Sequence, residues 1–433
     1  MIFGFSFLLL ISATTIKCDN IAFTPSIINI TVGTLPAPYA SQSATKFPNI
    51  VPIPSNPLLY VPQNFTVKLY KDGLSNPRAM IYTPTGDILV SEPAANKITI
   101  MIDGDPTQTH TFADVTNGLN NCYGMAFTQG YFYVGNEGDL RRYPYTNGTR
   151  MINGTGEVIM TYTSISPSAG HSTRSLVVSP TNDRIYVGIG SATNVDPELL
   201  PRASVQACNI DGTNQTTFTW GTRNPIGIAF HPISNDLYVC VQERDGLGDD
   251  LVPDYFTRIQ QGDFFGWPYA YLSPNNIDPR RNYSNGTSEN ATLVSQTKIP
   301  DVLFQAHSAV LDMKFYTESK FPQHYLNGAF AAFHGSWNKN LGTGYSIVFI
   351  PFGSDNRPVG YYENFVYGFL TNPSGPDTFG RPVGLLIMKD GSLLFSEDGH
   401  NRIYQVQYTN RANENRLYLL PFTLSFLVKY FLV

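Results

Sequence analysis

The fold is decided by the stretch Arg223-Asn224-Pro225-Ile226-Gly227-Ile228-Ala229-Phe230, in which a polar head precedes a strand-like apolar run. After a turn, Asp236-Leu237-Tyr238-Val239 follows as a second strand. The order of polar head, small or apolar step and apolar run occurs six times along the chain. The other five heads are Asn76-Pro77-Arg78, Asn120-Asn121-Cys122-Tyr123, His171-Ser172-Thr173-Arg174, His307-Ser308 and Arg381-Pro382. A self-similar unit of about 40–50 residues with four short strands is typical of a propeller blade, so the repeat predicts an all-β, six-bladed β-propeller.

The bulk composition agrees with a single β-rich ring. A chain of 433 residues has room for two or three domains, but propeller repeats add blades to one architecture. Aromatic residues make up 13% of the chain and charged residues only 14%, which excludes a disordered or fibrous protein. The net charge of −5 offers no basic footprint, so nucleic acid is not expected as a partner.

Four segments are predicted. Residues 1–18 resemble a signal peptide, residues 19–63 form a Pro/Ser-rich leader, and residues 64–409 form the propeller. The run 64–70 alternates like a strand and is expected to complete the last blade and close the ring. Residues 410–433 form a hydrophobic C-terminal anchor signal, either a cleaved tail for a glycosylphosphatidylinositol lipid anchor or a simple membrane anchor.

These termini predict a secreted protein or one on the extracellular face of the plasma membrane. Eight Asn-x-Ser/Thr sequons agree with passage through a secretory pathway as a glycoprotein. They begin at Asn29, Asn64, Asn147, Asn153, Asn214, Asn282, Asn285 and Asn290.

The cysteines allow two interpretations. Besides Cys18, the chain holds Cys122, Cys208 and Cys240, so at most one internal disulfide leaves a thiol over. Cys208 and Cys240 lie in predicted strands and could form a pair. Three buried, unpaired thiols are the alternative.

The polar heads point to an anionic ligand. The loop before each innermost strand opens on one face of a propeller, so the heads surround one channel mouth. They supply Arg78, Asn121, His171, Arg174, Arg223, Asn224, His307 and Arg381. Polar residues at strand starts also make turns, which is the simpler interpretation for a single asparagine. Several arginines at one funnel repel one another, and a ligand with several carboxylates would relieve that repulsion.

The acidic loop 243–251 (Glu-Arg-Asp-Gly-Leu-Gly-Asp-Asp-Leu) is a second dense segment. Acidic residues between glycines can turn oxygens toward a hard cation, but the loop lacks the EF-hand pattern. A solvated acidic loop is the alternative. The chain carries no Gly-x-Ser-x-Gly, His-Glu-x-x-His, Walker or Gly-x-Gly-x-x-Gly sequence, which argues against those enzyme classes.

Together, five motifs resemble the sorbosone dehydrogenase-like group, which belongs with the soluble quinoprotein glucose and pyranose dehydrogenases. The motifs are Arg223-Asn224-Pro225-Ile226-Gly227, the run 243–250, Gly262-Asp263-Phe264-Phe265-Gly266-Trp267-Pro268, His334-Gly335-Ser336-Trp337-Asn338 and Gly380-Arg381-Pro382-Val383-Gly384. The resemblance covers residues 64–408. It implies a six-bladed propeller that holds pyrroloquinoline quinone over the channel, with Ca²⁺ bound to the quinone.

The resemblance also implies roles for individual residues. His171 matches the family's general base, which takes the proton of a sugar C1 hydroxyl while hydride passes to the quinone C5 carbon. Arg223 and Asn224 match the pair that lies on the cofactor, and Arg381 matches an arginine that holds a cofactor carboxylate. Arg174 is a further cofactor-binding candidate from the same polar heads. His334 and Trp337 are expected to line the pocket.

For the metal, the resemblance implies that the backbone carbonyls of Asp245 and Gly246 ligate the catalytic Ca²⁺. Asp249 and Asp250 are expected as outer or structural Ca²⁺ groups. The chain departs from the bacterial glucose enzymes at two points. Gly170 replaces the acidic residue before the base, so the group that orients His171 is unidentified, and the family's cofactor-binding lysine has no clear counterpart.

Three functions are compatible with parts of this pattern. The first is a quinone-dependent oxidoreductase that oxidises the C1 hydroxyl of a small-molecule sugar and passes electrons to an external acceptor. The second is a non-catalytic propeller that binds a glycan or protein ligand at the cell surface. A propeller hydrolase would place carboxylates around Ca²⁺ at the axis, where this chain has arginines. The presence of His171 and of the Arg223-Asn224 pair favours the dehydrogenase.

Overall fold

The computed structural model describes residues 19–162 and 170–410. The predicted signal peptide and nearly all of the predicted C-terminal anchor lie outside the described residues. Within those two ranges, no helix is both long and apolar enough to span a bilayer.

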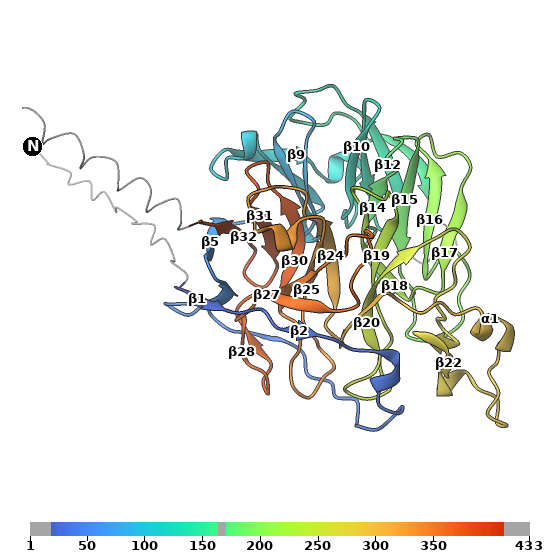
Figure 1. Cartoon of the computed structure of the whole chain (residues 1–433). Helices are drawn as coiled ribbons and strands as arrows, with labels where there is room; N and C mark the ends of the chain where they lie inside the picture. Colours follow the sequence, from blue (N-terminus) through green and yellow to red (C-terminus); the bar gives the residue numbers. More distant parts are fainter. Residues whose placement is uncertain (1–18, 163–169, 411–433) are drawn as a thin grey trace, which may run out of the picture.

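The described chain is all-β and consists chiefly of antiparallel sheets, which are numbered here in chain order (Figure 1). Sheet 1 holds β6 (Met80–Tyr82), β7 (Ile88–Glu92), β8 (Lys97–Met101) and β9 (Thr109–Ala113). Sheet 2 holds β10 (Met125–Thr128), β11 (Tyr131–Gly135), β12 (Asp139–Pro144) and β13 (Glu157–Thr161). Sheet 3 holds β14 (Leu176–Val178), β15 (Arg184–Ile189), β16 (Ser204–Asn209) and β17 (Thr216–Trp220).

The second half of the chain repeats the pattern. Sheet 4 holds β18 (Asn224–Phe230), β19 (Leu237–Gln242), β20 (Pro253–Ile259) and β23 (Val302–Ala306). Sheet 5 holds β24 (Val310–Phe315), β25 (Ala329–Phe333), β26 (Ser346–Ile350) and β27 (Tyr362–Val366), with β2 (Ile27–Ile28) added at its edge. Sheet 6 holds β30 (Pro382–Ile387), β31 (Leu393–Glu397), β32 (Arg402–Tyr408) and β5 (Phe65–Lys71).

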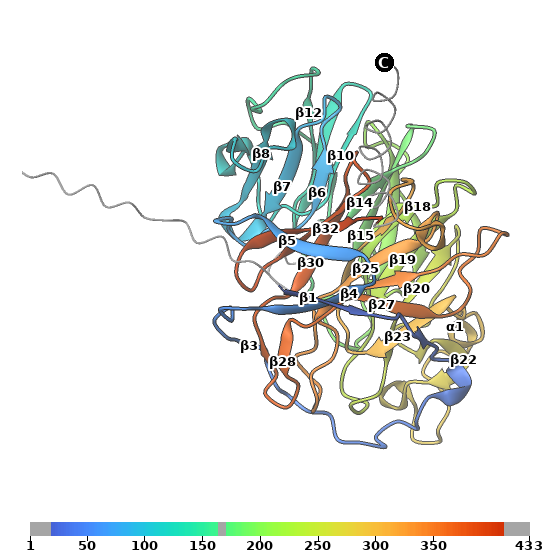
Figure 2. The ribbon, with the colours of Figure 1, turned by 60° about the vertical axis from the view of Figure 1, so that its left-hand side comes forward.

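Each sheet begins within or just after one of the six polar heads, as the repeat predicts. The first strands of the sheets contact one another in chain order, and β30 of sheet 6 also contacts β6 of sheet 1. As expected from the alternating run at 64–70, β5 pairs antiparallel with β32, which joins the two ends of the chain in one sheet. Figure 2 shows blue β5 beside dark red β32.

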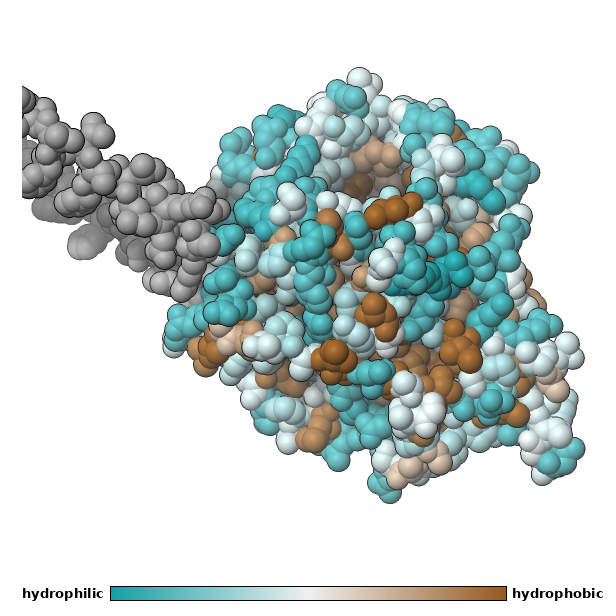
Figure 3. Space-filling model, viewed as in Figure 1, coloured by the Kyte–Doolittle hydropathy of each residue, from teal (hydrophilic) through white to brown (hydrophobic). Residues whose placement is uncertain are grey.

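The core lies between the sheets. Strands that are buried on both faces read as continuous apolar runs, which is why β19 (Leu-Tyr-Val-Cys-Val-Gln) does not alternate. Val239 and Val241 pack toward sheet 3, whereas Tyr238 and Cys240 pack toward sheet 5. Because apolar side chains turn toward neighbouring sheets, the face seen in Figure 3 carries separate apolar spots among polar side chains.

This packing decides between the two cysteine interpretations. Cys122, Cys208 and Cys240 are all buried and unpaired in the described chain, so the expected Cys208–Cys240 pair does not form. Cys208 on β16 packs toward sheet 2, while Cys240 on β19 packs toward sheet 5, so the two thiols face away from each other. Burial raises the pKa of Cys122 and of Cys208 to about 12.

The leader packs along the outside of the ring (Figure 1, dark blue). β1 (Asp19–Phe23) pairs in parallel with β4 (Leu58–Pro62), and β2 pairs with β27 of sheet 5. β3 (Asn49–Ile50) joins a small sheet with β29 (Asp377–Thr378) and β28 (Leu370–Asn372). The leader is therefore joined to other parts of the chain by strand pairing at β2 and β3, while β1 and β4 pair with each other inside it.

Short elements fill the loops. An excursion between β20 and β23 carries β21 (Ala270–Tyr271), β22 (Ser273–Ile277), η5 (Pro279–Arg281) and α1 (Ala291–Ser295). The remaining 3₁₀ turns are η1 (Val32–Thr34), η2 (Pro93–Ala95), η3 (Ile102–Gly104), η4 (Val115–Asn117) and η6 (Gln323–Tyr325). The excursion lies beside the loop 243–250, which makes it part of the site described below.

The closing strand β5 allows a direct test of how the ring is held. Phe65 is buried against the rings of Phe321, Tyr325 and Phe365, so Phe65→Ala should lower the free energy of unfolding by about 3–5 kcal/mol. The neighbouring Thr66 is exposed, and Thr66→Ala should change it by less than about 0.5 kcal/mol. Urea unfolding of both variants measures the difference. Equal effects would show that β5 does not close the core.

Candidate functional site

A cavity of about 140 Å³ lies where the heads of sheets 3, 4 and 5 meet. Its lining includes His171, Arg223, Asp245, His307, Trp337 and Asn338. A larger hollow of about 700 Å³ lies elsewhere, between the leader and sheets 5 and 6, and its lining holds no Asp, Glu, His, Lys or Arg. The smaller cavity is therefore the candidate site, because acidic, arginine and histidine side chains line it.

His171 is oriented by a backbone carbonyl. Its Nδ1 lies 2.8 Å from the Ser191 carbonyl oxygen, and because a carbonyl only accepts, Nδ1 carries the proton. Nε2 therefore keeps its lone pair. Burial, together with the charge of Arg223, lowers the pKa of His171 to about 3, so the ring is neutral at physiological pH.

Gly170 explains why no acidic residue precedes this histidine. Its φ is +71°, and an added Cβ would lie 2.3 Å from Cα of Ala192 and 2.4 Å from the Ser191 carbonyl oxygen. The backbone of the base therefore packs directly against the loop after β15. The contact that orients the imidazole comes from that loop, and a carbonyl leaves no side-chain signal in a sequence.

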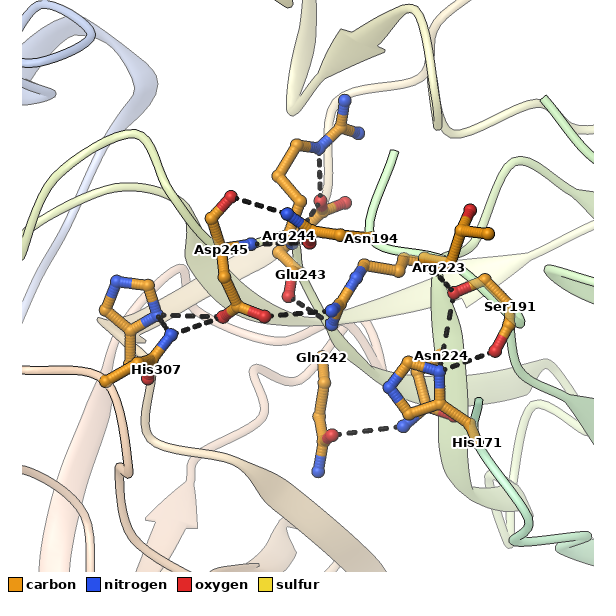
Figure 4. Close-up of polar contacts among 12 residues, drawn as sticks. His171, Ser191, Asn194, Arg223, Asn224, Gln242, Glu243, Arg244, Asp245 and His307 are labelled. Atoms are coloured by element: carbon orange, nitrogen blue, oxygen red, sulfur yellow. Dashed lines mark hydrogen bonds and ion pairs between the residues drawn. The ribbon is translucent and has the colours of Figure 1, made fainter. Parts of the chain in front are cut away.

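Asp245 lies between a guanidinium and an imidazole, as Figure 4 shows. One carboxylate oxygen accepts a hydrogen bond from Nη2 of Arg223 at 2.9 Å. The other accepts from Nδ2 of Asn338 and lies 3.5 Å from Nδ1 of His307. Burial opposes the charge of Asp245, but Arg223 and His307 outweigh burial and hold its pKa below the usual range. For His307, burial is likewise outweighed by Asp245, so its pKa is raised.

Arg223 and Asn224 meet at the start of β18. Nη1 of Arg223 donates to the Glu243 carbonyl oxygen at 2.6 Å, and Nδ2 of Asn224 donates to Oε1 of Gln242 at 3.0 Å. Nε of Arg223 and Oδ1 of Asn224 are buried and have no partner among the described residues. Such atoms cost free energy unless a ligand or water pairs with them, which keeps the two residues as candidate ligand contacts.

Arg174 lies behind the cavity instead of lining it. Its side chain is fully buried, and Nη1 donates to the carbonyl oxygens of His171 at 2.7 Å and Thr173 at 2.8 Å. Its guanidinium also lies 5.6 Å from the ring centroid of Tyr162. These contacts fix the loop that carries His171, while the buried Nε and Nη2 of Arg174 have no partner among the described residues, so its role as a cofactor contact stays a prediction.

Arg381 and His334 belong to a neighbouring polar cluster between sheets 5, 6 and 1. Nε2 of His334 lies 2.9 Å from the carboxylate of Asp398, which also pairs with Arg78 at 2.6 Å. Arg381 donates from Nε to the carbonyl of His334 and from Nη2 to that of Gly335. Burial lowers the pKa of His334 to about 4. The negative charge of Asp398 therefore offsets the positive charges of Arg78 and Arg381, two of the arginines that the sequence predicts at the channel mouth.

Trp337 lines the cavity and is still 39% exposed, so the cavity opens to solvent at this side chain. Its ring stacks on Phe47 of the leader with centroids 5.5 Å apart. The backbone N–H of Lys46 donates to the Trp337 carbonyl at 2.8 Å. The leader therefore forms part of the rim, which composition alone did not indicate.

The predicted calcium ligands do not fit a calcium site. The Asp245 carbonyl accepts hydrogen bonds from Nδ2 of Asn194 at 2.8 Å and from Nη1 of Arg280 at 2.6 Å. Asp249 accepts from the N–H groups of Ala44 and Asn340. Asp250 pairs with Nζ of Lys339 at 2.9 Å. Gly246 provides only its carbonyl, and the described residues hold no cluster of three His, Cys, Asp or Glu side chains suited to a metal.

Several residues of the site were not predicted from the sequence. Ser191 acts through its backbone, and Gln242 and Asn194 act through amides that resemble any strand-end amide. Arg280 sits in the excursion after β22, where only the Asp278-Pro279 turn could have marked it. Asp254 lines the cavity as a fully buried acid, and burial raises its pKa to about 7.

The chain is similar in sequence to known proteins. A Hypocrea jecorina protein named pyrroloquinoline quinone-dependent sugar dehydrogenase is 25% identical over 392 residues, covering 78% of this chain and 87% of its own. An uncharacterized protein of Borreliella burgdorferi is 35% identical over 240 residues, covering 55% of this chain and 61% of its own, less than two thirds.

Among solved structures, the calcium structure of the Trichoderma reesei Carbohydrate-Active Enzymes Family AA12 protein superposes with a TM-score of 0.67 at 23% identity. That match covers 88% of this chain and 99% of the other, so the two proteins share a fold. The TrAA12-like family model matches residues 59–253 and 252–409, most of the chain and nearly the range over which the motifs resemble quinoprotein dehydrogenases. The chain belongs to the TrAA12-like family.

Proposed function

We propose that this protein oxidises the C1 hydroxyl of an aldose or related sugar with pyrroloquinoline quinone as its cofactor. The observation that carries the proposal is a neutral, oriented imidazole and a guanidinium on the same cavity, those of His171 and Arg223. Relatives named as pyrroloquinoline quinone-dependent sugar and pyranose dehydrogenases in Hypocrea jecorina and Coprinopsis cinerea support it.

The donors around the cavity fit an acidic cofactor. Arg223 has a buried Nε–H without a partner that can donate to an anionic group, whereas the buried unpaired Oδ1 of Asn224 can only accept from a donor of the ring system. Arg381 is the proposed partner of a cofactor carboxylate, and His334 and Trp337 are proposed to border the bound ring. Since the cavity opens at Trp337, a ligand larger than its enclosed part can extend toward the surface.

His171 is the proposed base. Its Nε2 lone pair accepts the proton of the C1 hydroxyl, while Nδ1 keeps its hydrogen bond to the Ser191 carbonyl. A bound pyrroloquinoline quinone would supply the two-electron acceptor for oxidation of the sugar at C1. Arg174 holds the loop of the base, and Asp245 and His307 hold Arg223 in place.

The proposal extends to architecture and location. The six sheets are proposed to be the blades of one six-bladed β-propeller, and electrons are proposed to leave to an external acceptor. The protein is proposed to be secreted or held on the outer face of the plasma membrane by its C-terminal segment. Five sequons, at Asn29, Asn147, Asn153, Asn214 and Asn285, are exposed and none of the eight is buried, which suits a glycoprotein.

Cofactor binding tests the proposal as a whole. Purified protein should bind pyrroloquinoline quinone at about micromolar concentration, and the quinone absorbance should bleach on adding an aldose while a dye is reduced. Absorbance and fluorescence titrations measure both steps. Absence of binding would overturn the proposal. Binding without bleaching, across a panel of aldoses, would favour a non-catalytic propeller.

The role of His171 can be separated from cofactor binding. His171→Asn should lower kcat by about 10²–10⁴-fold, because no general base remains, while quinone affinity stays within about twofold. The control is His324→Asn, since His324 pairs with Glu363 outside the cavity and should leave kcat unchanged. Turnover at the wild-type rate in His171→Asn would refute the base assignment.

Protonation of the two histidines should differ in the cofactor-free protein. The pKa of His171 is lowered to about 3 by burial and Arg223, so its ring should stay neutral from pH 8 down to about 5. The pKa of His324 is raised by its hydrogen bond to Glu363, so that ring should charge above pH 6.5 as the pH falls. NMR titration of the ring signals distinguishes them. A His171 midpoint near 6.5 would contradict the buried, carbonyl-bound geometry.

A further inference from the structure

We propose that the guanidinium of Arg280 fills the position that a calcium ion would need beside the Asp245 carbonyl, so this protein holds its acidic quinone cofactor without calcium. The inference rests on the proposed function, because it concerns how the same site binds that cofactor. It departs from the calcium that the family resemblance implies for this loop.

The first support is the alignment of Arg280. Its Nε and Nη2 donate to the two carboxylate oxygens of Asp278 at 2.9 and 2.8 Å, a bidentate pair. The backbone N–H of Arg280 also donates to Asp278. This clamp leaves Nη1 directed at the Asp245 carbonyl, 2.6 Å away. The guanidinium is therefore fixed before any ligand arrives.

The second support is the acceptor capacity of the Asp245 carbonyl. A carbonyl oxygen has two lone pairs, and here Arg280 and Asn194 use both. Asn194 is itself fixed, because its Oδ1 accepts from the backbone N–H of Asp245 at 2.9 Å. No lone pair of this oxygen is left for a metal ion.

Further oxygens of the loop are also engaged. The Gly248 carbonyl lies 3.1 Å from Nε2 of His307, and Asp250 is paired with Lys339. At Gly246, an added Cβ would lie 3.1 Å from Nη1 of Arg280, so the guanidinium lies beside the α-carbon of this glycine. Ca²⁺ needs about six to eight oxygen ligands, and cations repel it. The loop offers mostly occupied oxygens beside protein cations.

The arrangement can still serve an anionic ligand. Of the five N–H groups of the Arg280 guanidinium, three donate to Asp278 and Asp245, and two have no partner among the described residues. The side chain is 22% exposed, so a ligand can reach it. Arg280 thus brings a fixed positive charge and free donors to the side of the cavity formed by Asp245.

Cofactor titration with and without calcium tests the inference on the full chain. Pyrroloquinoline quinone is titrated by protein fluorescence in EDTA and in about millimolar CaCl₂. We expect dissociation constants within about threefold of each other, because no calcium joins the complex. Binding only in CaCl₂ would overturn this inference and leave the proposed function standing. No binding in either buffer would overturn both.

Two variants locate the effect. Arg280→Ala should weaken binding in EDTA by about tenfold or more, since a charge-assisted contact is lost. Arg281→Ala is the matched control, because Arg281 pairs with Asp196 and Glu289 instead of the Asp245 carbonyl, and should bind as wild type. Equal affinities for the two variants would overturn the role of Arg280.

Direct metal binding provides a readout that needs neither cofactor nor turnover. Terbium is titrated as a calcium analogue, with luminescence sensitised by Trp267, whose Nε1 donates to the carbonyl of Asn194 beside Asp245. Wild type should show no saturable signal, because the Asp245 carbonyl is occupied. A saturable wild-type signal that calcium displaces would overturn the inference without requiring Arg280→Ala to fold.

Discussion

The site depends on one buried guanidinium, that of Arg244. Its side chain is fully buried, and it donates to Glu243, to Asp278 and to the carbonyls of Pro268 and Ala270. A buried charge is tolerated only when it is paired and hydrogen-bonded, so these contacts must form together. Because Arg244 binds both the loop 243–250 and the excursion at 268–278, it fixes the position of each relative to the other. Asp278 is shared with Arg280, so the same contact sets the charge beside Asp245.

Two histidines at the cavity have pKa values that are shifted in opposite directions. His171 hydrogen-bonds to a neutral carbonyl and lies near Arg223, so burial and repulsion both lower its pKa. His307 faces Asp245, whose carboxylate overcomes the effect of burial and raises the pKa of the imidazole. The neutral imidazole of His171 therefore lies on one side of Arg223, and the imidazole of His307, whose pKa is raised, lies on the other. This difference suits a site that removes a proton while it holds an anion.

The sequence predicts the order of the strands, because the polar heads repeat and the apolar runs mark the buried strands. The six polar heads precede the six first strands, and the alternating run at 64–70 pairs with the last strand, because period and burial leave a clear pattern. The Arg223-Asn224 head also pointed to the cavity. Backbone atoms gave no such pattern, so the Ser191 carbonyl that orients His171 was missed.

The metal prediction did not fit for a related reason. The acidic loop alone suggested oxygens turned toward a cation, but the cation beside it is Arg280, which comes from 35 residues further along the chain. Likewise, Cys208 and Cys240 lie in neighbouring sheets, but which face of a strand a thiol occupies depends on register, and the two thiols face apart. Side-chain direction and contacts between distant loops, rather than the order of strands, are what the sequence left undetermined.

The rim of the cavity is shaped from outside the repeat. The family match begins at residue 59, yet the leader before it contacts the site loops at several points. The N–H of Tyr39 donates to the Leu247 carbonyl, and Ser43 accepts from the N–H of Gly248. Most of these contacts are hydrogen bonds, and Phe47 remains 68% exposed although it stacks on Trp337.

A segment held in this way gains little from apolar burial, so its position depends on the loops it joins. Those loops belong to sheets 4, 5 and 6, because the Val51 carbonyl also lies 2.9 Å from Nε2 of His400, between β31 and β32. The leader thus links three neighbouring sheets across the cavity mouth. The cavity floor comes from residues within the family match, whereas this part of the mouth comes from a segment that precedes it.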